Sequence, residues 1–174
     1  MQTISSFLDG MMSFLAQTAA DPIAYSVVLF FYAILAAIVL PIPVEVGLLL
    51  SPHTPVILLV VILGLGKMVG SILVFYLGLG IGDKIEAWTA RWPGFGLLVT
   101  KSEWLVKKLN YLGLYIILSV PLMTDTVPLY IFSILNKNGV FSVQMFAFVN
   151  LCAGITRGSI LLILLSLFGV NLFN

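Results

Sequence analysis

Two motifs that pair a proline with an acid interrupt the apolar runs of this chain and limit what it can fold into. Pro41 is followed four residues later by Glu45, and Pro121 is followed four residues later by Asp125. Proline removes a backbone hydrogen bond from a helix, and in lipid the freed groups must find partners in protein or water. A carboxylate at membrane depth is costly, so it marks a candidate functional site. We therefore predict two broken helical segments, each with an acid at its break.

The composition is typical of an integral membrane protein. Hydrophobic residues make up 61% of the 174 residues and charged residues 9%, whereas a soluble domain carries about 25% charged residues. The net charge of +1 predicts no nucleic-acid partner. With one Cys and one His, we expect no internal disulfide, no metal site and no cofactor.

Long apolar runs predict the helices that cross the membrane. The runs Val56–Leu79 and Phe141–Phe168 are long enough to span a bilayer. The run Ile23–Leu40 has two interpretations that the sequence leaves open. It is either a full span or one arm of a re-entrant hairpin that closes at Pro41 and Pro43.

A second hairpin is predicted in the other half of the chain. The run Tyr111–Val120 is too short to span a bilayer. It is broken between Pro121 and Pro128, and a short apolar stretch, Leu129–Leu135, then resumes. We therefore interpret this region as a re-entrant hairpin.

Together these elements predict an all-α integral membrane protein with long transmembrane helices and two proline-broken, re-entrant helical hairpins related as an inverted repeat. A single transmembrane domain covers 23–174, with half-repeats over 23–80 and 109–170 joined by a cytoplasmic segment, 81–108. With re-entrant hairpins, each half contains an odd number of spans, so the halves insert in opposite orientations. Residues 1–20 are predicted to form an amphipathic helix that lies at the membrane interface or packs on the bundle, with packing favoured.

Each long run also carries a base, so the chain has two intramembrane acid–base sets. Lys67 accompanies Glu45 in the first half, and Arg157 accompanies Asp125 in the second. An unpaired charge at this depth costs about 2.5–3.5 kcal/mol on insertion scales, which favours pairing or hydration. We predict that these four residues bind substrate or protons. The alternative is a purely structural quartet of salt bridges.

Glycines in the second apolar run predict close helix packing. Gly66 and Gly70 form one small-xxx-small pair, and Gly78 and Gly82 form another. Faces of this kind allow two helix backbones to approach each other in lipid.

In this combination the chain resembles the DedA/VTT family, the bacterial and archaeal relatives of the SNARE-associated Golgi proteins. The resemblance covers roughly Phe30 to Ser166. Pro41-Ile42-Pro43-Val44-Glu45 is similar to the family's first re-entrant motif. Gly66-Lys67-Met68-Val69-Gly70, followed by Phe75-Tyr76-Leu77-Gly78 and Gly82, resembles its glycine-rich helix. Pro121 to Pro128 stands in the place of its second re-entrant motif. Leu118 and Thr124 stand where the family commonly has arginines, and Ile57 stands where it often has a second acid. The resemblance implies facing re-entrant loops, lipid scrambling, carrier-lipid recycling and proton-coupled transport.

The predicted function is a membrane transporter or lipid scramblase that moves a phospholipid or a small ion through a polar midplane cavity, with proton coupling. Glu45 and Asp125 would exchange protons, while Lys67 and Arg157 would act as counter-ions or phosphate ligands. The alternative is a non-transporting membrane scaffold whose glycine faces bind partner helices. No hydrolase or protease motif is present, so we expect no enzyme. The expected partners are membrane lipids, a proton or another ion, and a second copy of the chain, in a prokaryotic cell membrane.

The segment 81–108 is predicted to be cytoplasmic because it holds most of the positive charge, namely Lys84, Arg91, Lys101, Lys107 and Lys108. In a Cys152→Ser background, the variant Lys101→Cys should resist an impermeant thiol reagent added to intact cells and react after permeabilisation. Ready modification in intact cells would contradict this topology.

Overall fold

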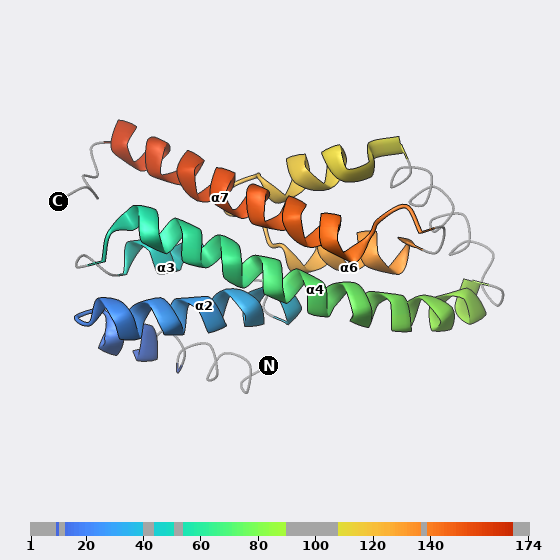
Figure 1. The fold of residues 1–174 in the computed structure, drawn as a ribbon, viewed down its shortest axis with the longest axis horizontal. Helices are drawn as coiled ribbons and strands as arrows, with labels where there is room; N and C mark the ends of the chain where they lie inside the picture. The colour runs from blue at the N-terminus through green and yellow to red at the C-terminus, as the bar shows by residue number, and fades with distance from the viewer. Residues whose placement is uncertain are drawn as a thin grey trace.

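The computed structural model describes residues 10, 13–39, 44–50, 54–89, 108–136 and 139–168, with the backbone only for 82–89. Every regular element within these residues is a helix, which confirms the predicted all-α class. The helices are a short one over 13–18, α2 (Pro22–Ile38), α3 (Val46–Leu49), α4 (Val56–Thr89), one over Lys108–Leu118, α6 (Thr126–Ile134) and α7 (Val143–Leu167) (Figure 1).

Two of the helices are long and apolar enough to cross a membrane. They are Val56–Ile81, which forms most of α4, and Val143–Leu167, which is α7. The first begins with the predicted run Val56–Leu79 and continues past its end to Ile81, and the second lies within the predicted run Phe141–Phe168. The helices α2 and Lys108–Leu118 are apolar but shorter.

Local capping explains where α2 and α7 begin. The Asp21 carboxylate accepts hydrogen bonds from the backbone N–H groups of Ile23 and Ala24, at 2.9 and 3.3 Å. At the start of α7, the Ser142 hydroxyl accepts from the Met145 N–H. Each cap satisfies donors that the first turn of a helix leaves free.

Glycines bring α2 and α4 together side by side. A Cβ atom added at Gly66 would lie 2.7 Å from the Cβ of Ala33, and one added at Gly70 would lie 2.7 Å from the Cβ of Ala37. The contacting residue numbers rise together, so the two helices run in the same direction. The absence of a Cβ at these two positions permits the close approach.

The helix α7 packs on another side of α4 and runs in the opposite direction. Gly158 lies against Val60, and Gly154 lies against Gly64. The residue numbers change in opposite senses along this contact, so the helices are antiparallel. The helix α4 therefore contacts α2, α6 and α7 and forms the centre of the bundle.

The chain doubles back once before α4 and once before α7. After α2, the chain returns toward the start of that helix, because the Tyr25 hydroxyl donates to the Gly47 carbonyl of α3. In the later half, Lys108–Leu118 and α6 run in opposite directions in Figure 1. The chain then enters α7 from the end of the molecule where Lys108–Leu118 began.

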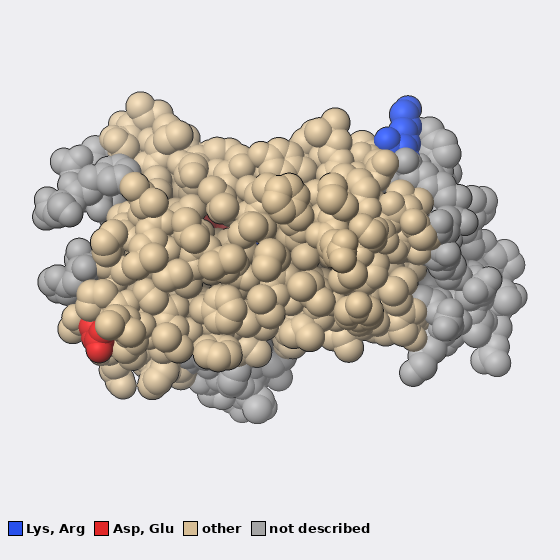
Figure 2. Space-filling model, in the orientation of Figure 1, with Lys and Arg blue, Asp and Glu red and all other residues tan. Residues whose placement is uncertain are grey.

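Apolar side chains cover the outside of the bundle as well as its core. Ile23, Ile57 and Ile163 are 79, 73 and 61% exposed. On the face drawn in Figure 2, charged groups of the described residues project only near the two ends of the long axis. An apolar exterior of this extent is unusual for a soluble monomer.

Part of the predicted N-terminal helix packs on the bundle. Leu15 is fully buried and joins the core cluster that contains Tyr25 and Leu29. Pro41 and Pro43 lie outside the described residues. So do most of the N-terminal segment and most of the predicted cytoplasmic segment.

Gly66→Ala should destabilise the protein, whereas the matched change Gly80→Ala should not. A Cβ at Gly66 would lie 2.7 Å from the Phe30 carbonyl oxygen, while a Cβ at Gly80 would meet nothing within 4 Å. Overpacking typically costs about 1–3 kcal/mol, and alanine at an open helical position gains up to about 1 kcal/mol over glycine. Thermal unfolding of both variants in detergent checks the prediction. Equal melting temperatures for the two would contradict it.

Candidate functional site

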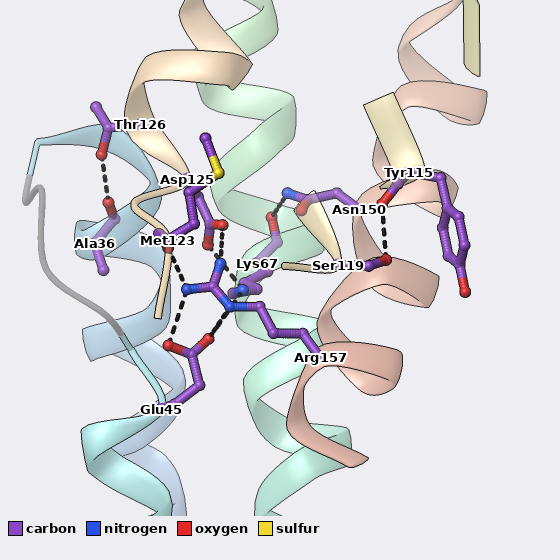
Figure 3. Close-up of polar contacts among 10 residues, drawn as sticks. All are labelled: Ala36, Glu45, Lys67, Tyr115, Ser119, Met123, Asp125, Thr126, Asn150 and Arg157. Atoms are coloured by element: carbon purple, nitrogen blue, oxygen red, sulfur yellow. Dashed lines mark hydrogen bonds and ion pairs between the residues drawn. The ribbon is translucent and has the colours of Figure 1, made fainter. Parts of the chain in front are cut away.

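Four charged side chains that are far apart in the sequence meet inside the bundle. Glu45 directly precedes α3 and Asp125 directly precedes α6, while Lys67 lies on α4 and Arg157 on α7. Glu45 is 0%, Lys67 1%, Asp125 6% and Arg157 1% exposed. Figure 3 shows their charged ends pointing toward one another. We call these four residues the charge cluster; it contains two acids and two bases.

Arg157 joins both acids of the charge cluster. Its Nη2 donates to Glu45 Oε2 at 2.9 Å, and its Nε forms an ion pair with Glu45 Oε1. Its Nη1 donates to Asp125 Oδ1 at 2.5 Å. The planar guanidinium offers donors in several directions at once, so one side chain can bind both acids.

Lys67 contributes a positive charge to the cluster but no side-chain hydrogen bond. Its Nζ lies 2.8 Å from Asp125 Oδ2 and 3.7 Å from Glu45 Oε1. Neither contact has the geometry of a hydrogen bond, and Nζ is enclosed by protein. Since an ammonium group has three donors, Lys67 retains hydrogen-bonding capacity that the described protein atoms do not use.

A glycine makes room for the Lys67 side chain. A Cβ added at Gly154 of α7 would lie 3.0 Å from Lys67 Cδ. The lysine stem thus lies against bare backbone of α7, about one helical turn from Arg157. The small residue therefore helps to bring the two bases into one cluster.

Polar side chains satisfy backbone carbonyls where the helices end or break. Arg157 Nη2 donates to the Met123 carbonyl, and the Thr126 hydroxyl donates to the Ala36 carbonyl at 2.9 Å. The second bond fastens the last part of α2 to the start of α6, beside the charge cluster (Figure 3). Carbonyls at helix ends need such partners when water is excluded.

Two further polar residues form hydrogen bonds near the cluster or next to it in the sequence and were not among the predicted site residues. Asn150 is fully buried, and its Nδ2 donates to the Lys67 carbonyl at 2.8 Å. The Tyr115 hydroxyl bonds to the Thr156 hydroxyl, at 2.8 Å, next to Arg157. Asn150 lies about two helical turns before Arg157 and hence on the same face of α7. That spacing is the sequence signal that could have identified it.

The two described prolines of the predicted breaks have different positions. Pro121 lies in the turn that follows the helix Lys108–Leu118. Pro128 lies inside the first turn of α6, where a missing N–H removes no helical hydrogen bond. Pro128 is therefore compatible with the start of this helix.

The predicted packing glycines lie at internal contacts where their surroundings are described. Gly66 and Gly70 face α2, and Gly78 faces Ser133 of α6. Gly82 lies in α4, in the part for which only the backbone is described.

Comparison with known proteins finds no match for this chain among protein-family models, curated proteins or solved structures. The resemblance to the DedA/VTT family stays a prediction. In the described part of the chain, no three His, Cys, Asp or Glu residues are grouped to hold a metal ion. The chemistry that the charge cluster supports is exchange of ion-pair partners, because a carboxylate that takes up a proton releases a base for another anion.

Arg157→Met should strongly destabilise the protein, because two buried acids would then face one base. Removing one partner of a buried ion pair costs about 3–5 kcal/mol. Adding Glu45→Met removes the stranded carboxylate and should recover much of the loss, since Lys67 and Asp125 remain as a neutral pair. Melting temperatures in detergent measure both effects.

The control for this series is Gln144→Met, which places the same side chain at an exposed position of α7 and should change the melting temperature little. A double variant no more stable than Arg157→Met alone would show that charge pairing does not explain the cluster.

Proposed function

We propose that this chain is a membrane transporter or lipid scramblase of the DedA/VTT type. In this proposal it moves a phospholipid or a small ion through the charge cluster, with proton coupling. The observation that carries the proposal is the burial in one cluster of two acids, which directly precede α3 and α6, and two bases, which lie on α4 and α7. Stability alone does not require such a cluster, because well-packed apolar residues often stabilise a protein equally well or better.

The outer surface and the helix lengths support a membrane location. The apolar exterior would face lipid chains, and the exposed charges near the ends of the bundle would face water. Lys67 lies close to the middle of the apolar helix Val56–Ile81, and Arg157 lies close to the middle of Val143–Leu167. In a bilayer both bases would therefore lie near the midplane, where charged residues mark substrate or ion pathways.

The course of the chain favours two re-entrant hairpins related as an inverted repeat. The first hairpin would consist of α2 and α3, so that α2, with 17 residues, is one arm and not a full span. The second would consist of Lys108–Leu118 and α6. The long helices that follow, α4 and α7, are antiparallel, as an inverted repeat requires. Each hairpin contributes one acid to the charge cluster.

The mechanism we propose is an exchange of ion-pair partners. When one carboxylate takes up a proton, one positive charge of the cluster is left without a counter-ion. That charge can bind an anionic headgroup or another anion, through the fork of Arg157 or the ammonium of Lys67. Loss of the proton and of the anion restores the neutral cluster. The cluster is therefore neutral both when the proton and the anion are bound and when both have left.

Asp125→Asn should reduce transport to background, while the matched change Asp21→Asn should leave it unchanged. Both replace a carboxylate by an amide of similar size, but Asp21 is exposed and caps α2, a role that asparagine also performs. The assays are fluorescent-lipid scrambling and proton flux in liposomes reconstituted with the purified full chain.

The outcome separates the transport proposal from the scaffold alternative. Normal flux in the Asp125→Asn variant would refute a role of this carboxylate in transport. No flux of lipid or protons in the unmodified protein would refute the proposed function and favour a scaffold whose charges are structural.

A further inference from the structure

The two acids of the charge cluster are held differently by Arg157. Glu45 is bound through both of its carboxylate oxygens, by Nη2 and by Nε of the guanidinium. Asp125 receives one guanidinium nitrogen, Nη1, on its Oδ1. Arg157 thus makes one hydrogen bond to each acid, and its second contact with Glu45, between Nε and Oε1, is an ion pair without hydrogen-bond geometry. Both oxygens of each acid contact a base, but both oxygens of Glu45 contact the same guanidinium.

The residues around the two acids also differ in their exposure. Val44 and Leu48, on either side of Glu45, are each 1% exposed. A hydrogen bond to or from α2 ties the chain after each acid, from Tyr25 to Gly47 and from Thr126 to Ala36, so the difference between the acids lies in exposure. The residues before Asp125 lie at the surface, with Leu122 61% and Met123 39% exposed. Asp125 thus follows a segment that borders the outside, whereas Glu45 is enclosed by the core.

The backbone before Asp125 also departs from ordinary geometry. Leu122 has a φ of 61°, in the left-handed region that bulky residues rarely adopt. Neither Asp125 nor Glu45 makes a side-chain capping bond to the helix that follows it. Both acids are therefore held in the cluster mainly by their contacts with the two bases, and only Asp125 follows a residue with this backbone conformation among the described residues.

The Lys67 ammonium has no hydrogen-bond partner among the described residues, whereas Arg157 lacks one only at Nε. The ammonium is buried, and Asp125 Oδ2 lies 2.8 Å away from it. If Asp125 moved outward, Lys67 would be left with donors and a positive charge. A ligand that offers an acceptor oxygen could then replace the carboxylate.

From these differences we infer that the two acids divide the work of the site. Asp125 is the exchangeable carboxylate, which leaves Lys67 when a ligand oxygen enters. Glu45 is a positioning residue, which stays bound to Arg157 and keeps α3 against α7. That this exchange serves transport rests on the proposed function. The difference in accessibility between the two acids can be tested without any transport measurement.

The test is labelling of the full chain in detergent with the apolar reagent dicyclohexylcarbodiimide. The protonated carboxyl adds across one C=N bond of the reagent, and the product rearranges to a stable N-acylurea that retains all atoms of both reactants. Peptide mass mapping against time gives the rate at each acid. We expect Asp125 to react at least about tenfold faster than Glu45, because local opening favours the less protected segment. In unfolded protein, both acids should react at similar rates.

A variant tests the positioning role of Glu45 with a readout that a purely structural role would not move. In Glu45→Gln both bases are left with Asp125 as their one carboxylate in the cluster, so they attract it more strongly and its labelling should slow by about tenfold. If the variant is unfolded, Asp125 would instead label as fast as in the unfolded control. In that case the assignment is decided by the labelling rates of Asp125 and Glu45 in the folded, unmodified protein.

Equal rates at the two acids in the folded protein, faster reaction at Glu45, or no reaction at Asp125 would each overturn the assignment. If labelling is asymmetric as expected while liposomes show no flux, the division between the acids stands and the transport function fails. If flux is present and labelling is symmetric, the transport function stands and the division between the acids fails.

Discussion

The contact of Arg157 with Glu45 and Asp125 is the interaction on which the interior of this molecule depends. It fixes two stretches of chain that regular helical hydrogen bonding does not hold, the turn before α3 and the turn before α6. The same guanidinium also satisfies the Met123 carbonyl. Without Arg157, two acids and a carbonyl would lose their main partner in surroundings that exclude water, where unsatisfied polar groups are costly.

Helix packing brings the two bases close enough to share the acids. The antiparallel contact of α4 with α7 aligns Lys67 with Gly154, and the missing Cβ there leaves space for the lysine stem. Asn150 then ties the backbone of α4 at Lys67 to α7. The parallel contact of α2 with α4 through Gly66 and Gly70 brings the end of α2 to Thr126. The small residues therefore permit close helix packing and, through it, bring the charged side chains together.

The neutrality of the charge cluster lowers the cost of burying it, and the unequal contacts of its two acids favour an exchange of ion-pair partners at one of them. Two acids and two bases cancel, so the interior carries no net formal charge. Glu45 is enclosed and contacts one guanidinium through both oxygens, whereas Asp125 borders an exposed turn and faces a lysine whose ammonium has no hydrogen-bond partner among the described residues. A cluster in which every bond was equally strong would favour stability over exchange. We therefore regard the unequal bonding as the structural basis of the proposed partner exchange.

The helical class, the positions of the two long apolar helices and the identity of the four buried charges could be predicted from the sequence. These follow from local properties: run length, the effect of proline on a helix, and the cost of a charge among apolar residues. The pairing of the charges could not be predicted, because the sets predicted from each half paired Glu45 with Lys67 and Asp125 with Arg157. The fold places Arg157 in contact with both acids and brings Asp125 nearer to Lys67 than Glu45 is. It also sets the hydrogen bond of Asn150 to the Lys67 carbonyl. The physical reason is that these contacts depend on the register in which α4 meets α7, which is set by side-chain packing between residues more than eighty positions apart in the chain.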